Sequence, residues 1–433
     1  MTTVLLEPTD VLFFRDAVPM SAGQGRGAGA RLPFPSTVHE ALRASLLLSR
    51  GVEGLPKTTT WTQRNGKGER FISTRDFQSL RTVGPFPWTE TRRLLLPVPL
   101  DAVRADQGKA VACLELWRDP TPPPDATFRP CCLPVAVTPP DKLAQLSGWW
   151  EVAQYTAYLR GETLAEADAF EPIRTDTLWQ EEARVGVALD PGTFAAESGK
   201  LFAGGFLRAD EKTRFAAQFW LGEKSPGTEQ RDLAGLDWLL LGGERRLARL
   251  HRASDDVFAA LPPAPEFGGP GPCLLKWTLV TPAIFAHGAL PGWCSHPLEK
   301  PDGLPQGRVR LGAARAQSRR RDRSESAPLP GRAQLIAWCL GRPLTVSGWD
   351  TAEHAPKPTQ LAVPAGSAYY FLCEDAATAN ALAARLHWHP RSDRYGDKGC
   401  GYGLCSAVAR MHPQSSADVP ALAARLFSPN TPA

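Results

Sequence analysis

Short apolar runs separated by turns rich in Gly and Pro dominate this chain, and they predict strands more often than helices. Residues 3–14 (TVLLEPTDVLFF) are rich in Val, Leu and Phe, which favours a strand bent at Pro8. Residues 184–190 and 200–208 predict two strands joined by a tight turn, and residues 213–221 predict a third. The first part of the chain therefore reads as a sheet-forming region.

Helical spacing is restricted to a few segments. Apolar residues recur every three or four positions from Val38 to Leu46, and Thr37 with Glu40 has the spacing of a capping box, so the pattern predicts a helix that begins near Thr37. Two further helices are expected, one near 141–159 and one over 375–388. Strands are expected in the second half at 273–281, 333–340, 367–373 and 404–410.

The order of these elements predicts an α+β protein with antiparallel sheets and long insertions, because strands and helices do not alternate regularly. Two ferredoxin-like (RRM-like) domains, each with the order β-α-β-β-α-β, suit this pattern. The segment 261–272 (LPPAPEFGGPGP) is the clearest linker. We therefore expect one domain over 1–260, with an insertion at about 51–180, and a second over 273–433.

Composition supports a folded chain and locates its positive charge. The 433 residues are 43% hydrophobic and 22% charged, which suffices for a packed core. The formal net charge is only +4, yet residues 308–323 hold seven Arg and one Asp. The remainder of the chain is thus slightly acidic, and this tract is either a contact for phosphates, through Arg319, Arg320 and Arg321, or a solvated surface.

Two glycine clusters are the strongest candidates for contact with a ligand backbone. The first alternates Gly between positions 23 and 29, carries Arg26 and Arg31, and leads into the first helix, whose N-terminus favours anions. The second follows the helix at 375–388 and is expected at a sheet edge; it holds Lys398, Gly399, Gly401, Tyr402 and Gly403. Its N–H groups could meet phosphates, and the Tyr402 ring could stack on a base. The alternative is that both clusters are plain turns.

Several classes of chemistry lack their sequence signals. The nine Cys have no metal-binding spacing, and no Walker, HExxH or Ser-His-Asp pattern occurs, so we expect neither a metal nor a nucleotide cofactor. His39 is the best single candidate for acid–base chemistry, although it is more simply a helix-surface residue. No apolar stretch has the length of a membrane span, and the unpaired cysteines suit a reducing cytoplasm.

Several segments resemble the RAMP proteins of CRISPR effectors. The resemblance begins at residues 6–16 (LEPTDVLFFRD) and 33–43 (PFPSTVHEALR) and continues at 183–190, 200–210 and 241–250. It extends to residues 281–293, 347–350, 356–371 and 401–405 in the second half. Together the segments are similar to the third-subunit family of the type III-B Cmr complex.

This resemblance implies a role without catalysis. It implies an RNA-binding subunit that holds the 5′ repeat-derived tag of the crRNA, and contacts target RNA indirectly. It also implies that the chain bridges the large polymerase-cyclase subunit to the backbone RAMP subunits. Residues Arg15, Ser36, Thr37 and Arg43 match the family's first motif, and Gly399, Gly401 and Gly403 match its last.

The residues leave two other functions open. One is a metal-independent RNA-processing endonuclease of the RAMP type that uses a histidine such as His39 with a glycine-rich loop. The other is a protein scaffold that does not contact RNA. The 51–180 insertion matches the family only loosely, and the 308–323 tract is longer than the family's loop and has no template there, so the resemblance assigns neither a role. The segment that would form a thumb-like hairpin against a guide–target duplex is not identified by sequence alone.

Overall fold

A computed structural model gives the fold. It describes residues 1–14, 26–27, 31–50, 60–64, 70–74, 76–91, 93–105, 111–118, 131–135, 143–162, 170–223, 227–295, 307–311, 328–350, 355–407 and 409–427. All statements below refer to these residues.

A seven-stranded sheet organises the first part of the chain. Its neighbouring strands pair antiparallel throughout. In spatial order they are β12 (Trp149–Glu151), β6 (Arg93–Pro97), β5 (Leu80–Thr89), β15 (Thr213–Leu221), β1 (Thr2–Pro8), β17 (Leu247–Arg252) and β16 (Trp238–Leu240).

Both faces of this sheet carry apolar side chains, because alternate residues of each strand point to opposite sides. Val4 and Leu6 of β1 face one core, which α1 (Pro35–Ser49) covers with Val38 and Leu42. Leu5 faces the other core, which contains residues from both halves of the chain. A strand with this near-continuous apolar run is therefore central and buried on both faces.

A four-stranded antiparallel sheet organises the second part. Its order is β19 (Ala333–Cys339), β24 (Ala368–Cys373), β18 (Cys273–Leu279) and β25 (Gly403–Ser406). The helix α4 (Ala376–Leu386) connects β24 toward β25 and packs on the sheet with Leu382 and Leu386. Asp375 caps α4 by accepting a hydrogen bond from the Thr378 N–H at 2.7 Å.

The remaining elements are short and decorate these two sheets. None of the described helices is long and apolar enough to cross a membrane. The helical elements are α2 (Val152–Arg160), α3 (Gly227–Ala234), α5 (Val419–Phe427) and the 3₁₀ turns η2 (Thr175–Thr177) and η4 (Gly396–Lys398). The strands are β2 (Arg26–Gly27), β3 (Thr60–Arg64), β4 (Arg70–Thr74), β7 (Ala102–Ala105), β8 (Val111–Cys113), β9 (Glu115–Trp117), β10 (Leu133–Val135), β11 (Leu143–Gln145), β20 (Leu344–Val346), β21 (Trp349–Asp350), β22 (Ala355–Pro356) and β23 (Gln360–Ala362).

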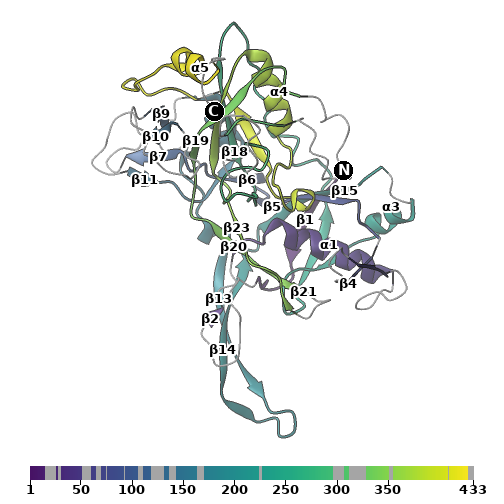
Figure 1. Ribbon diagram of the computed structural model, residues 1–433. Coiled ribbons are helices and arrows are strands. Elements are labelled where there is room, and N and C mark those ends of the chain that lie inside the picture. The colour runs from purple at the N-terminus through teal and green to yellow at the C-terminus, as the bar shows by residue number, and fades with distance from the viewer. Residues whose placement is uncertain are drawn as a thin grey trace.

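A long hairpin, β13 (Trp179–Leu189) and β14 (Ala196–Ala209), projects from the body of the molecule (Figure 1). Its turn is closed by Asp190, whose carboxylate accepts hydrogen bonds from the backbone N–H of Gly192 and of Thr193 at 3.0 and 2.8 Å. The hairpin leaves the sheet region directly before β15. It is therefore an excursion from the seven-stranded sheet, and β15 returns the chain to that sheet.

The two halves share a hydrophobic core across the expected domain boundary. Trp388 and Phe258 pack against Phe86 of β5, with ring centroids 6.1 and 5.9 Å from that of Phe86. The linker also bonds to the second half, because the Phe267 N–H donates to Asn380 Oδ1 at 2.8 Å. The division into 1–260 and 273–433 stays a prediction, and any such domains would be tightly packed together.

A buried ion pair joins the insertion to the second sheet. Asp101 is fully buried, and its carboxylate lies 3.1 Å from Nζ of Lys276 on β18. The hydroxyls of Tyr370 and Tyr158 donate to the same carboxylate at 2.8 and 2.5 Å. Burial, followed by the charge of Asp101, raises the pKa of both tyrosines well above their usual range, so both remain donors. The buried carboxylate is thus fully partnered.

Most expected elements are present, with shifted ends. The first strand ends at Pro8 and not at residue 14, and β13 and β14 extend beyond the expected hairpin strands. The helix α1 begins at Pro35, and no side chain caps it, so the expected capping box at Thr37 is wrong. Proline suits the first helical turn because its missing N–H would be unpaired there anyway. The expected helix over 141–159 is mostly replaced by two short strands before α2.

Replacing Lys276 with Met should leave Asp101 buried with an uncompensated charge. We expect Lys276→Met to reduce the free energy of unfolding by about 3–5 kcal/mol. The control is Asp176→Asn, which removes an exposed ion pair with Arg174 and should leave the melting temperature unchanged. Wild-type stability of Lys276→Met in denaturant unfolding would contradict the role given to this ion pair.

Candidate nucleic-acid interface

The structure brings the first helix and the C-terminal glycine loop together, although their contacting residues Glu40 and Lys398 are 358 positions apart along the chain. Nζ of Lys398 forms an ion pair with Glu40 on α1, and Arg81 Nη1 lies 4.0 Å from Asp397. Gly399 approaches Pro35 and the backbone carbonyls of β5 so closely that an added Cβ would lie 3.1–3.2 Å from them. We call this junction of α1, β5 and η4 the helix–loop junction.

The ion pair changes what Lys398 can offer. Burial opposes ionisation of Glu40, but Lys398 outweighs it and holds the pKa of that carboxyl below its usual value. The sequence predicts Lys398 as a free phosphate contact. In the structure Glu40 already balances the charge of Lys398. The ion pair attaches the loop to α1, and a phosphate would have to compete with Glu40 for the ammonium group.

Ser36, Thr37 and Arg43 lie on α1 at or near this junction. Ser36 and Thr37 are half-buried in the first turn of the helix, and Arg31 is exposed just before it. Arg43 reaches the other way, since its guanidinium donates to the Asp76 carbonyl at 3.1 and 3.3 Å. The hydroxyls, the helix N-terminus and Arg31 form the part of this group that an anion could approach.

His39 is a core residue and not a helix-surface residue. It is 5% exposed, and its Nδ1 lies 3.2 Å from the Thr82 hydroxyl. Burial is the largest cause that lowers its pKa, to about 4, so the ring is neutral near pH 7. A buried neutral imidazole bound to a hydroxyl suits a packing role better than proton transfer to a large substrate.

Two glycines of the C-terminal loop are required by the fold. Gly401 has φ +78°, and a Cβ there would collide with the backbone N of Ser392. A Cβ at Gly403 would lie 2.7 Å from the Thr278 carbonyl oxygen and would also collide with the Trp277 indole. Both positions are therefore packed against the second sheet or the segment before the loop, and a side chain at either one would disturb the fold. The loop does precede β25, the edge strand of its sheet, as the sequence predicts.

Tyr402 is not open for base stacking. It is 4% exposed, and its ring packs against Trp388 with centroids 5.4 Å apart. Its backbone N–H donates to the Thr281 hydroxyl at 2.9 Å. The ring therefore belongs to the core shared by the two halves, which corrects its assignment as an RNA-stacking residue.

Other predicted site residues lie elsewhere or outside the described residues. Arg15, Arg319, Arg320 and Arg321 lie outside them, and Arg26 is described only in its backbone. That backbone pairs in parallel with β14, so the segment after the first strand reaches the hairpin. Two arginines at the start of the 308–323 tract point inward. Arg308 is 7% exposed and donates to the Leu426 carbonyl at 3.1 Å, and Arg310 donates to the Cys294 carbonyl at 2.9 Å.

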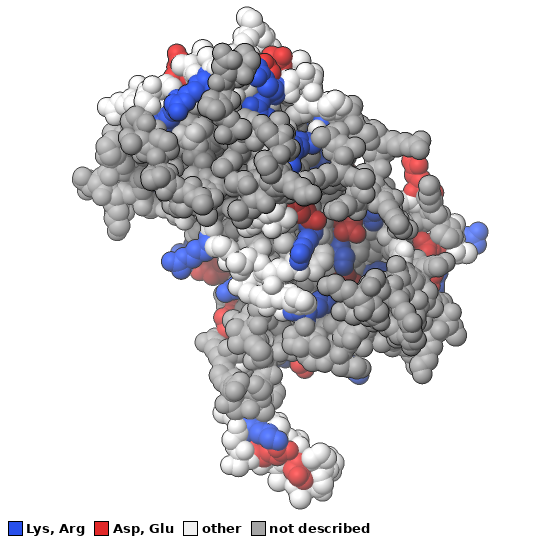
Figure 2. All heavy atoms as spheres, in the orientation of Figure 1, with Lys and Arg blue, Asp and Glu red and all other residues white. Residues whose placement is uncertain are grey.

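The hairpin offers a surface that the residue types alone did not single out. Val185, Val187 and Leu189 alternate on one face of β13, and Leu201 lies opposite Val187 on β14. Val185 is 68% exposed, and Phe194 at the turn is 77% exposed. Figure 2 shows mainly uncharged side chains at the end of the hairpin. The alternation of Val and Leu was visible in the sequence, but whether that face is covered could not be read from it.

The root of the hairpin is held by charge. Asp10 pairs with Arg184 at 3.3 Å and with Arg208 at 3.1 Å, and Glu182 pairs with the same two arginines. Leu12 and Leu207 exchange two backbone hydrogen bonds of 2.8 Å. These contacts join the hairpin to the chain after β1 and so fix the direction in which its apolar face points.

The chain is similar to known proteins at the level of one family model and of several solved structures. Residues 4–409 match the family model described as CRISPR-associated protein (Cas_Cmr3). No curated protein has a matching sequence. A chain of a type III-B Cmr-beta structure bound to cognate target RNA is 14% identical, with a TM-score of 0.43 over 92% of this chain and 95% of that one. A chain of a Csm3–Csm4 subcomplex from a type III-A interference complex is 10% identical, with a TM-score of 0.39 over 87% and 94%.

The glycine of the loop that the fold most requires is Gly401. We expect Gly401→Ala to lower the melting temperature strongly, because the new methyl group meets the Ser392 backbone. The control is Gly199→Ala in β14, which has φ +73° but nothing within 4 Å, so it carries only the roughly 1–2 kcal/mol cost of a positive φ. Equal melting temperatures for the two variants would show that the close approach at Gly401 does not constrain the fold.

Proposed function

The chain belongs to the Cas_Cmr3 family of CRISPR-associated proteins, and from this premise we propose that it is a non-catalytic RNA-binding subunit of a type III-B effector. In this proposal it holds the 5′ repeat-derived tag of the crRNA. The observation that carries the proposal is the helix–loop junction. Two motifs from opposite ends of the chain meet there, where Lys398 pairs with Glu40.

The chemistry of the junction suits an RNA backbone. The first turn of α1 presents N–H groups and the hydroxyls of Ser36 and Thr37, and anions are favoured at such a helix end. Arg31 adds an exposed guanidinium at the entrance to the helix. Gly399 fits the loop against α1 and β5, and Gly401 and Gly403 fit it against Ser392 and β18, so the role of the glycines is to shape the site. Arg15, Arg26 and Arg319–Arg321 remain predicted phosphate contacts.

We propose that the hairpin of β13 and β14 is the thumb-like segment that meets the guide–target duplex. A projecting ribbon with an exposed apolar face is costly to leave in water, which supports a partner for it. Apolar side chains of this kind contact the faces of bases when they are inserted between base steps. The ion pairs of Asp10 and Glu182 would set the angle at which the hairpin enters the duplex.

We also propose that both halves are ferredoxin-like units. The support is a common strand order. When the four strands β1, β5, β15 and β17 of the first half are numbered in chain order, they lie side by side as second, third, first and fourth. The strands β18, β19, β24 and β25 of the second half lie in the same order. The packed junction of the halves would let the chain bridge the large polymerase-cyclase subunit and the backbone subunits.

All nine cysteines are free, which supports a cytoplasmic location.

The RNA-processing endonuclease is the second candidate, and one assay separates it from the first. Its candidate residue, His39, is buried and neutral, which favours the binding role. Incubation of the purified chain with repeat RNA should give no cut. A unique cleavage site that is lost in His39→Gln would replace the proposal with an enzyme.

The tag itself gives the direct test of RNA binding. We expect the purified chain to bind a guide RNA with its 5′ tag more tightly than the same RNA without it, measured by fluorescence anisotropy. Arg31→Ala should weaken binding and reduce the salt dependence by roughly 0.7 in log–log slope, as expected for one lost phosphate contact on a single strand. The control, Arg174→Ala, changes another exposed arginine, which lies away from the junction. Equal affinity for the two RNAs would contradict tag recognition.

The hairpin requires a different RNA for its test. Val187→Ser combined with Leu201→Ser should leave the melting temperature unchanged, because both side chains are exposed. Affinity for a guide–target duplex should fall by roughly tenfold or more, since burial of one Val or Leu side chain contributes about 1.5–3 kcal/mol and about 1.4 kcal/mol corresponds to tenfold. The control is Ala188→Ser on the opposite face of β13. Unchanged duplex affinity in the double variant would remove the thumb role from this hairpin.

A further inference from the structure

A row of five side chains crosses one face of the seven-stranded sheet, on the side opposite α1. It consists of Trp88 (β5), Arg214 (β15), Glu7 (β1), Arg249 (β17) and Trp238 (β16), one from each of five neighbouring strands. The strand register places Arg214 beside Trp88, Glu7 beside Arg249, and Arg249 beside Trp238. We call it the tryptophan–arginine row.

The two ends of the row repeat one arrangement. Arg214 Cζ lies 5.8 Å from the Trp88 ring centroid, and Arg249 Cζ lies 5.8 Å from that of Trp238. At the inner end, Trp88 is buried, and Arg214 Nε lies 3.1 Å from Glu7 Oε2. The protein thus completes this end of the row with its own residues.

The outer end is open. Trp238 is 47% exposed, and the neighbouring Leu247 on the same face is also exposed. Arg249 is exposed and forms no ion pair with any residue in the described part of the chain. Residues 253–261 cover the inner half of this sheet face through Val257 and Phe258, but they do not reach the outer half. The tryptophan–arginine pair is therefore covered by the protein at the inner end, in Trp88 and Arg214, and left uncovered at the outer end, in Trp238 and Arg249.

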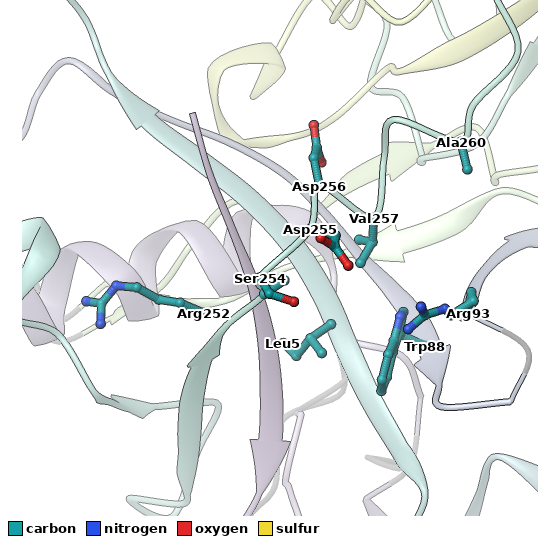
Figure 3. Close-up of a pocket in the computed structure, with 10 residues that line it drawn as sticks. Leu5, Trp88, Arg93, Arg252, Ser254, Asp255, Asp256, Val257 and Ala260 are labelled. Carbon is teal, nitrogen blue, oxygen red and sulfur yellow. The ribbon is translucent and has the colours of Figure 1, made fainter.

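A pocket of about 400 Å³ adjoins the inner end of the row. Leu5, Trp88, Arg93 and Val257 are among the residues that line it, and Figure 3 shows Trp88 and Arg93 side by side on one wall. The indole N–H of Trp88 has no acceptor among the described residues. The sheet face therefore continues from an exposed tryptophan to a hollow whose lining combines apolar side chains with the charged groups of Arg93, Asp255 and Asp256.

The charges around the row favour a protein over RNA as the occupant. Glu7 is already bonded to Arg214 and to His251, the latter at 2.6 Å. Further carboxylates stand at the margins: Glu90 beside Arg214, Asp237 beside Arg252 just before β16, and Glu244 in the β16–β17 turn. Phosphates would meet these carboxylates, and the balanced charge gives no basic stripe of the kind that RNA-binding surfaces carry.

We propose that the open end of the tryptophan–arginine row docks another protein subunit of the effector, through a segment that presents an apolar side chain to Trp238 and a carboxylate to Arg249. Tryptophan and arginine are the residues that most often dominate the binding energy of protein interfaces. The carboxylate follows from charge complementarity, because Arg249 is the cation of the row that lacks one. This inference rests on the proposed function for its partner, and it adds a surface on the sheet face opposite the helix–loop junction.

Site-specific photo-crosslinking tests this surface in the assembled complex. Trp238 is replaced by p-benzoylphenylalanine, and the chain is co-expressed with the other subunits of its own CRISPR system and their guide RNA. We expect an adduct with a protein subunit whose yield falls roughly tenfold when Arg249→Glu is added, since charge reversal at an interface costs more than 1.4 kcal/mol. The same reagent at Leu361, exposed and outside the row, should give a result that Arg249→Glu does not change.

Each other outcome overturns the proposal. An adduct with RNA would make the row a nucleic-acid site, an adduct only with a second copy would make it a self-association surface, and no adduct would leave it solvated. The affinity of Arg249→Glu for tagged guide RNA separates the docking proposal from the proposed RNA function. If Arg249→Glu binds tagged RNA like the wild type but loses the adduct, docking is supported. If the wild-type chain shows no preference for the tag but still forms the adduct, the RNA function fails and the docking surface stands.

Discussion

The buried contact between Asp101 and Lys276 is the constraint on which the arrangement of the two halves depends. A carboxylate and an ammonium group so far from water are stable only if every partner is in place, and here Tyr158 and Tyr370 complete the set. The four residues come from the segment after β6, from α2, and from two strands of the second sheet. None of these elements can shift alone without exposing a charge to an apolar core. The insertion is therefore part of the scaffold, and it holds the two sheets at a fixed distance.

The helix–loop junction depends on this rigidity. Lys398 reaches Glu40 only because the shared core brings η4 onto α1 and β5. Gly399 then fits against the carbonyls of β5, and Gly401 fits against Ser392. A site formed by two halves of one chain responds to any change in how those halves pack. The hairpin projects from the same sheet whose face carries the tryptophan–arginine row. One scaffold would therefore position RNA on one side and a neighbouring subunit on the other.

The sequence predicted the elements better than the environment of their residues. Period-two and helical spacing located β15, β18, β24 and α4 to within a few residues, since both patterns follow directly from which side chains face a core. Tyr402 and His39 were misread because polar groups on a loop or helix surface look the same in sequence as polar groups whose partners lie far along the chain. Thr82, the partner of His39, and Trp388, the partner of Tyr402, are such residues. The exposed face of the hairpin was missed for the opposite reason, since Val and Leu in alternation predict burial.

The central claim is that the two halves form one folded unit whose junction holds the RNA tag. The most direct measurement inserts a specific protease site between Gly268 and Gly269, where the chain faces open space, and follows the cut protein by size exclusion together with its affinity for tagged guide RNA. The account predicts that the two fragments remain associated under native conditions and bind the tagged RNA as the intact chain does. Separation into two folded fragments, with tag binding retained by one of them alone, would contradict it.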